Sequence, residues 1–193
     1  MPAAKTDLPT IAFASREAFR DWLTENGGSS SGLWVKFAKA GSGHPSVTKA
    51  EAVEEALAHG WIDGQLAAFD DQWWLTRFTQ RRARSKWSKV NTEIATRLIE
   101  SGQMTPAGMR EVQAAKADGR WAVAYEPQSR ATVPEDLQRA LDATPAALEF
   151  FHTLKGANRY AILYRVGEAK KPETRERRIR HFVAMLAEGK TLH

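Results

Sequence analysis

Cysteine is absent from this chain of 193 residues, and its absence excludes several classes of protein. Without thiols the chain can form no disulfide framework, no thiolate zinc cluster and no cysteine nucleophile. Residues 1–20 also lack a long apolar run. They carry charges at Lys5, Asp7, Arg16 and Glu17 and contain neither a signal-peptide core nor a membrane span. Together these absences predict a cytoplasmic protein with no transmembrane segment.

Sequence motifs for cofactors and metals are missing as well. The glycine- and serine-containing loop at residues 41–46 leads into a helix capped at Thr48, and such a helix start could hold an anion. The loop lacks the lysine and spacing of a P-loop and the glycine pattern of a dinucleotide-binding fold. An ordinary turn and helix cap is therefore the simpler interpretation, and we expect no cofactor and no metal ion.

What the sequence does contain is an uneven distribution of charge. Its 28 Lys and Arg residues exceed its 23 Asp and Glu residues, which gives a formal net charge of +5. Residues 51–71 hold six acidic side chains and no Lys or Arg, whereas residues 72–92 hold six basic side chains and no Asp or Glu. Residues 155–190 add ten basic side chains against four acidic ones. A positive balance favours encounter with anionic partners.

The N-terminal half has the periodicity of a strand, a helix and a second strand. Residues 33–38 combine aliphatic and aromatic side chains with one charge, Lys36, as a half-buried strand does. Thr48 and Glu51 then form a capping box that opens a helix, and Gly60 ends it. A second strand begins at residue 61. The simplest arrangement of a strand, a crossover helix and a strand places the two strands side by side and parallel.

The tryptophan-rich segment at residues 61–79 predicts a β-hairpin. Strands over residues 61–69 and 72–79 flank a tight turn at Asp70 and Asp71. A two-residue turn places small residues opposite the tryptophans, which gives the large rings room. The expected pairs are Ala68 with Trp73, Ala67 with Trp74, Leu66 with Leu75, Gly64 with Arg77, and Asp63 with Phe78.

Residues beyond the hairpin have helical signals. Thr105-Pro106 and Thr144-Pro145 each place a capping hydroxyl before a proline at the first helical position. The predicted fold is α+β and predominantly helical, with a small three-stranded mixed sheet (β-α-β plus hairpin) in the N-terminal half and a helical C-terminal half. The predicted organisation is a flexible tail at 1–10, an α/β part at 11–126, a connector at 127–133 and a helical part at 134–193, packed on the first as one structural unit.

The basic segment that follows the hairpin is the leading candidate for a binding site. Arginines can hold an anion by paired hydrogen bonds while an aromatic ring, here Trp61 or Trp87, stacks on a base or sugar. The competing interpretation is a solvated basic turn with tryptophans in the core. The predicted ligand-binding residues are Trp61, Asp63, Arg77, Phe78, Arg81, Arg82, Arg84, Lys86, Trp87, Lys89 and Asn91. The expected ligand is nucleic acid or a phosphorylated metabolite.

Two other functions stay open at this point. Asp63 with His59 or His44 could form an acid–base pair of an enzyme, although no catalytic order of residues supports it. The acidic segment at residues 51–71, with Glu51, Glu54 and Glu55, could instead bind a basic protein partner. The residues do not determine the catalytic group or the oligomeric state.

The chain resembles the YdeI/OmpD-associated family, also labelled bacteriocin-protection. The matching motifs include Gly60-Trp61-Ile62-Asp63-Gly64 and Ala169-Lys170-Lys171-Pro172-Glu173-Thr174-Arg175. Further matching segments lie at residues 33–39, 41–43, 51–57, 77–79, 81–82, 87–88, 104–108 and 158–160. The chain has Gln80 where the family often has proline, and His59 where it often has an aromatic residue.

The family resemblance implies a stress or bacteriocin-resistance role without a settled biochemical activity. An association with an outer-membrane porin would require export, and the sequence shows no export signal. Direct capture of a cationic bacteriocin by a basic protein is disfavoured by charge repulsion. The expected partner is therefore an anionic ligand rather than a porin.

Overall fold

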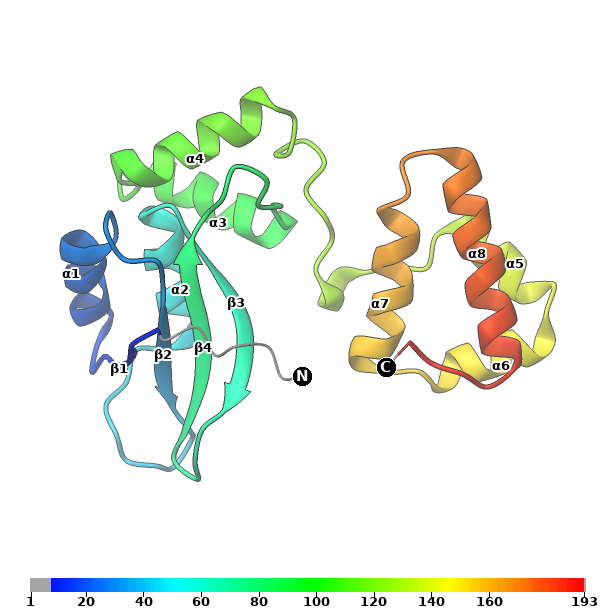
Figure 1. Ribbon diagram of the computed structural model, residues 1–193, viewed down its shortest axis with the longest axis horizontal. Helices are drawn as coiled ribbons and strands as arrows, with labels where there is room; N and C mark the ends of the chain where they lie inside the picture. Colours follow the sequence, from blue (N-terminus) through cyan, green and yellow to red (C-terminus); the bar gives the residue numbers. More distant parts are fainter. Residues whose placement is uncertain (1–7, 193) are drawn as a thin grey trace. The chain divides into compact units, whose positions relative to one another are not determined.

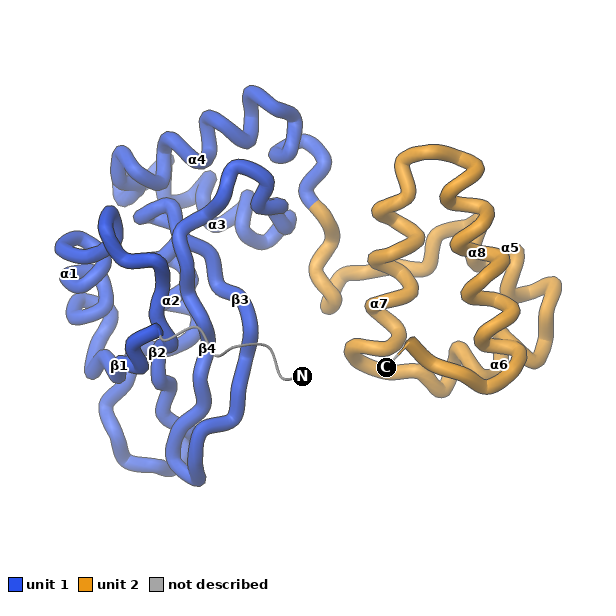
Figure 2. The backbone as a smooth tube through the Cα atoms, viewed as in Figure 1, with its two compact units in different colours: residues 1–124 blue, residues 125–193 orange. Residues whose placement is uncertain are grey.

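The computed structural model describes residues 8–192 and divides the chain into two units, Met1–Ala124 and Tyr125–His193 (Figures 1 and 2). Most of the tail predicted at residues 1–10 lies outside the described residues, and Thr10 already begins a strand. Whether the C-terminal helices pack on the N-terminal part stays a prediction.

A four-stranded sheet forms the centre of the N-terminal unit. It consists of β1 (Thr10–Ala12), β2 (Leu33–Ala38), β3 (Trp61–Ala68) and β4 (Trp73–Gln80) in the order β1-β2-β4-β3. β1 runs parallel to β2, and β4 runs antiparallel to both β2 and β3. The mixed α+β class is confirmed, but the prediction of three strands was wrong because β1, with three residues, is too short to show an alternation.

The predicted neighbours β2 and β3 are separated by β4, so the expected parallel pairing between them was also wrong. The physical reason is burial. Thr76 and Phe78 of β4 are fully buried, which suits a central strand bonded along both edges. β3 contains Gly64 and Gln65, both exposed, and takes an edge of the sheet.

The predicted hairpin register is correct at the open end of the hairpin, and the observed register differs from it by one residue near the turn. Asp63 lies opposite Phe78 as predicted, whereas Ala68 lies opposite Trp74 rather than Trp73. A β-bulge between Asp63 and Leu66 absorbs the difference, because it places two residues of β3 against one of β4. The glycine at position 64 suits this irregular backbone.

Two helices cover one face of the sheet (Figure 1). They are α1 (Arg16–Asn26) and α2 (Lys49–Ala58), and α2 begins with the predicted capping box. The core that they share with the sheet includes Phe19 and Leu23 of α1 and Ala52 and Ala56 of α2. Its strand residues are Leu33, Val35, Phe37, Trp61 and Phe78.

Two more helices pack on the opposite side of α2. These are α3 (Lys89–Glu100) and α4 (Pro106–Ala117), which lie beyond one end of the sheet in Figure 1. Their core contains Leu57 and Ala58 of α2 with Trp87, Leu98 and Val112. Both sides of α2 are thus buried, and its C-terminal end lies next to the start of α4.

The C-terminal unit is helical, as predicted. It contains a short 3₁₀ helix, η1 (Gln128–Arg130), followed by α5 (Glu135–Asp142), α6 (Pro145–Thr153), α7 (Gly156–Gly167) and α8 (Pro172–Ala187). Its own core includes Leu137, Leu141, Phe151, Phe182 and Leu186. Arg175 of α8 forms an ion pair with Asp136 of α5 and also donates a hydrogen bond to the Val166 carbonyl, which joins three helices.

Candidate functional site

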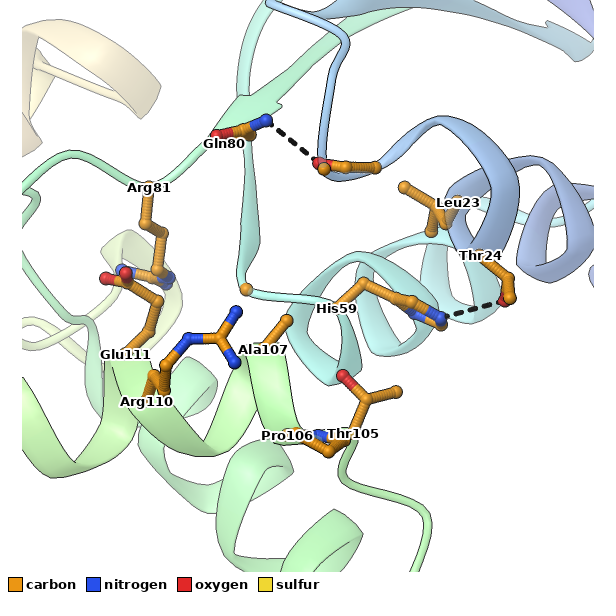
Figure 3. Close-up of a pocket in the computed structure, with 13 residues that line it drawn as sticks. Leu23, Thr24, His59, Gln80, Arg81, Thr105, Pro106, Ala107, Arg110 and Glu111 are labelled. Carbon is orange, nitrogen blue, oxygen red and sulfur yellow. Dashed lines mark hydrogen bonds between the residues drawn. The ribbon is translucent and has the colours of Figure 1, made fainter.

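A pocket of about 490 Å³ opens where four elements of the N-terminal unit meet (Figure 3). Its walls come from the end of α1, the turn between α2 and β3, the end of β4 and the first two turns of α4. The polar side chains in the lining are Thr24, His59, Gln80, Arg81, Thr105, Arg110 and Glu111. Residues from widely separated segments therefore share one cavity.

Close packing of α4 against α2 shapes this pocket. A Cβ atom on Gly108 would lie 2.3 Å from the Ala58 carbonyl oxygen and 2.8 Å from that of Leu57, so only glycine fits there. Thr105, the N-cap of α4, donates hydrogen bonds from its backbone N–H and its hydroxyl to the Ala58 carbonyl, at 3.1 and 2.7 Å. These contacts hold the N-terminus of α4 at the edge of the pocket.

His59 is positioned by hydrogen bonds on both of its ring nitrogens. Nδ1 lies 2.8 Å from the Glu55 carbonyl oxygen, and because a carbonyl only accepts, Nδ1 carries a proton. Nε2 lies 3.3 Å from the Thr24 hydroxyl oxygen (Figure 3). The Thr24 hydroxyl also lies 2.9 Å from the Arg20 carbonyl oxygen, to which it can only donate, so its one proton is not free for Nε2 at the same time. These two contacts of the ring nitrogens fix the His59 ring at the edge of the pocket.

A buried carboxylate lies one helical turn before His59. Glu55 is 3% exposed and accepts hydrogen bonds from Arg16 at 2.5 Å and from Arg20 at 2.8 and 3.0 Å. Burial acts to raise the pKa of Glu55, but the hydrogen bonds from Arg20 and Arg16 outweigh it and hold the pKa below its usual value. A second cavity of about 300 Å³ adjoins this cluster and shares Thr24, His59 and Thr105 with the pocket.

Two arginines give the pocket its positive character. Arg110 is exposed, reaches toward the middle of the pocket in Figure 3, and has no hydrogen bond or ion pair with any of residues 8–192. Arg81 is only 7% exposed, and its guanidinium lies 3.6 Å from the centre of the Trp87 ring. Glu111 is the one carboxylate in the lining. Two guanidinium groups against one carboxylate leave the pocket with a positive balance.

The structure places most of the predicted binding residues elsewhere. Trp61, Phe78 and Trp87 are at most 2% exposed, and the Trp61 indole donates a hydrogen bond to the Gly27 carbonyl. The stacking role predicted for Trp61 and Trp87 therefore does not fit, because these rings are core residues. Of the eleven predicted residues, Arg81 alone lines the pocket. Asn91 contributes its backbone N–H to the Ser88 cap of α3.

The predicted basic residues Arg82, Arg84, Lys86 and Lys89 are exposed on the loop and helix start that follow β4. This loop is held from inside by two other arginines. Arg81 donates to the Lys86 carbonyl at 3.2 Å, and Arg120 donates to the Ser85 carbonyl at 2.8 Å. The exposed cations thus stand on an ordered backbone. Arg77 lies elsewhere, on β4.

The acid–base set considered from the sequence is divided among separate partners. Asp63 forms an ion pair with Lys49, whose pKa is lowered by burial against the opposing effect of Asp63. His44 contacts the Gln72 side chain at 2.5 Å and stacks on Trp73, while His59 faces Thr24. Among residues 8–192 no hydrogen bond or ion pair joins Asp63 to either histidine, so the geometry supplies no acid–base pair.

The acidic segment at residues 51–71 has three of its six carboxylates, on Glu54, Glu55 and Asp63, paired with cations of the N-terminal unit. Five of its six carboxylates accept hydrogen bonds or form ion pairs within the N-terminal unit. These carboxylates are on Glu51, Glu54, Glu55, Asp63 and Asp70. The three carboxylates outside these ion pairs, on Glu51, Asp70 and Asp71, keep their negative charge, and binding of a basic partner by this segment stays a prediction.

Neither membrane helices nor metal sites are found in the described part of the chain. No helix within residues 8–192 is long and apolar enough to cross a bilayer. The same residues contain no group of three or more His, Asp or Glu side chains placed to hold a metal ion.

Comparisons with known proteins assign the two units to different family models. Residues 11–111, which are 101 of the 193, match a domain of unknown function, DUF8412. Residues 130–189 match the OmdA model, described as bacteriocin-protection, YdeI or OmpD-associated. The chain belongs to the DUF8412 family and carries a YdeI/OmpD-associated domain in its C-terminal unit. No curated protein and no solved structure matches it.

The resemblance inferred from sequence motifs is thus confirmed for the C-terminal part of the chain. The motifs at residues 33–108 fall within the region that matches DUF8412. The pocket residues also belong to this region, since they run from Leu23 to Glu111. Sequence reasoning missed Thr24, Arg110 and Glu111, although the helix start at Thr105-Pro106 was visible.

Proposed function

We propose that the N-terminal unit is an anion-binding module whose ligand is a small phosphorylated molecule held in the pocket at the start of α4. The observation that carries this proposal is Arg110, an exposed cation without a partner among residues 8–192, which reaches into a pocket that also contains Arg81. Guanidinium groups bind phosphate through paired, charge-assisted hydrogen bonds.

Neighbouring groups support the same ligand chemistry. Thr24 and Thr105 line the pocket with hydroxyls whose protons go to the Arg20 and Ala58 carbonyls, which leaves the guanidinium groups as its charged donors (Figure 3). The N-terminus of α4 adds the positive end of a helix dipole. The volume of about 490 Å³ is in the range of small-molecule sites and favours a metabolite over a polymer.

Isothermal titration calorimetry at low ionic strength tests the proposal. The probes are inorganic phosphate, sugar phosphates and nucleoside monophosphates, each titrated into the full chain. Losing a charge-assisted hydrogen bond costs about 1.5–3 kcal/mol, so Arg110→Ala should bind the best probe about 10- to 100-fold more weakly. Arg177→Ala removes an equal charge from an exposed position on α8 and should bind like the unmodified protein.

Two results would contradict the proposal. One is the absence of saturable binding for every phosphorylated probe. The other is equal weakening by Arg110→Ala and Arg177→Ala, which would show that only net charge matters.

We further propose that a cytoplasmic bacteriocin-resistance role, which the OmdA description suggests, depends on this binding. The same two variants test it when expressed in a bacteriocin-sensitive bacterium. Survival should be raised by the unmodified chain and by Arg177→Ala, and not by Arg110→Ala. If all three chains protect equally, protection does not depend on the pocket.

A further inference from the structure

The face of the sheet opposite α1 and α2 combines aromatic rings with cations. Strand pairing defines this open sheet face, because residues opposite one another on neighbouring strands project to the same side. Its residues are Thr10, Ala12, Trp34, Lys36, Ala38, Ile62, Ala67, Trp73, Leu75, Arg77 and Thr79. The buried core clusters of the N-terminal unit draw their β2 residues from the other face, namely Leu33, Val35 and Phe37.

Trp34 and Arg77 lie directly opposite each other in the centre of the open sheet face. Both side chains are partly exposed. Arg77 forms no hydrogen bond or ion pair through its side chain with the described residues, and Trp34 makes no aromatic or cation–π contact with them. A ring and a guanidinium therefore stand side by side with their main interaction groups available.

A second group of rings and cations lies toward the hairpin turn. The Lys36 ammonium is 4.4 Å from the centre of the Phe69 ring and 4.7 Å from that of the Trp73 ring. His44 stacks on Trp73, with 5.0 Å between the ring centres. Phe69 is 50% exposed, which is unusual for a large apolar ring. Its ring is available for stacking at the edge of the open sheet face.

The charge of the open sheet face is of one sign. Lys36 and Arg77 project from it, and none of its eleven residues is acidic. The adjoining turn carries two carboxylates, Asp70 and Asp71, and Asp70 keeps its charge while it accepts the backbone N–H groups of Gln72 and Trp73. A partner that lies over Lys36 and Arg77, rather than over the turn, should therefore be anionic and should also offer flat surfaces to the rings.

We propose that the open sheet face binds single-stranded nucleic acid, with bases stacked on Trp34 and Phe69 and phosphates paired with Lys36 and Arg77. A single strand combines repeated negative charge with exposed rings, whereas a duplex keeps its bases paired and stacked inside. An apolar protein partner would leave Lys36 and Arg77 without counter-charges. The site shares no residue with the anion pocket at α4, so it holds or fails independently of the proposed function.

Fluorescence anisotropy with labelled oligothymidylate and oligouridylate of about 12 nucleotides, within the usual site sizes of such surfaces, tests the inference. The full chain should bind single strands at least tenfold more tightly than a duplex of equal length. Replacing both cations in Lys36→Gln/Arg77→Gln should reduce the slope of log K against log salt by about 1.4, since each phosphate contact on a single strand contributes about 0.7.

Matched variants separate the site from general charge. Arg177→Gln, an exposed position on α8, combined with Arg97→Gln on α3 removes the same charge and should leave the salt slope nearly unchanged. Trp34→Ala should weaken binding about tenfold and Trp34→Phe should restore most of it, because stacking needs only a ring. Circular dichroism and thermal unfolding identify a variant that fails to fold. The two double cation variants keep Trp34, so the salt-slope test remains valid even if Trp34→Ala does not fold.

Three outcomes would overturn the inference. The first is no binding of any single strand at low salt. The second is equal loss of affinity in the two double cation variants. The third is self-association of the full chain that Trp34→Ala abolishes while no oligonucleotide binds, which would assign the face to a second copy of the chain.

Discussion

Replacing Gly108 with alanine should loosen the whole α2–α4 contact on which the pocket depends. The added Cβ would meet the Ala58 carbonyl oxygen at 2.3 Å, the Leu57 carbonyl oxygen at 2.8 Å and the Met104 sulfur at 2.4 Å. The methionine can move aside, but two backbone carbonyls at the end of a packed helix cannot. The helix α4 must therefore shift away from α2, and the hydrogen bonds from Thr105 to Ala58 weaken with it.

The size of the Gly108→Ala effect follows from two unfavourable contributions and one favourable contribution to the free energy of unfolding. Overpacking costs about 1–3 kcal/mol, and the loss of a buried hydrogen bond adds about 1 kcal/mol. Alanine in a helix returns about 0.5–1 kcal/mol relative to glycine. We expect a net loss of about 2–3 kcal/mol in the free energy of unfolding of the N-terminal unit, or about 8–12 °C in Tm.

Urea unfolding of the full chain measures the Gly108→Ala effect, followed by tryptophan fluorescence for the N-terminal unit and by far-ultraviolet circular dichroism for both units. The control is Gly167→Ala at the end of α7, where a new Cβ would meet no atom within 4 Å. This control should be neutral or stabilising by up to about 1 kcal/mol. If Gly108→Ala proves as harmless as Gly167→Ala, the close approach of α4 to α2 is wrong, and the pocket geometry that rests on it fails.

Two further predictions concern ionisable groups. Glu55→Gln should destabilise the chain by about 3 kcal/mol at neutral pH, because Arg16 and Arg20 lose a buried partner. The folded-state pKa of Glu55 lies below its ordinary value of 4.5, so its contribution is complete above that pH and is lost as the pH falls further. Urea unfolding should show the difference between the two chains shrinking as the pH falls below 4.5, and a constant difference would refute the ion pair. Burial raises the pKa of Tyr160 to about 12, and its hydroxyl donates to the Glu126 carbonyl. In an ultraviolet pH titration, Tyr160→Phe should therefore lack the tyrosine ionisation that occurs at the highest pH in the unmodified chain.

Local sequence signals predicted the helices and strands of this protein well. The capping box at Thr48 and Glu51 and the Thr105-Pro106 helix start are formed as expected. These devices act within four residues, so their outcome depends little on the rest of the chain. The strand pattern at residues 33–38 likewise reports directly which side chains of β2 are buried.

Strand order and hairpin register required the tertiary structure. The sequence predicts that residues 61–68 and 73–80 pair, but not that β4 lies between β2 and β3. Burial of Phe78 and Thr76 decides that order, and it is a property of the assembled core. The bulge after Asp63 depends on the same assembly, because a one-residue shift in register is compensated only where the strands meet.

The candidate site shows the same division between sequence and structure. Clustered charge correctly marked residues 77–89 as basic, yet only Arg81 of the predicted residues lines the pocket. Arg110 reaches the pocket because Gly108 lets α4 approach Ala58, a residue 50 positions earlier in the chain. The sequence by itself determined the charge, the helix starts and the strand faces, since these rest on neighbouring residues. Only the tertiary structure decided which arginines meet in one cavity, because that depends on packing between segments far apart in the chain.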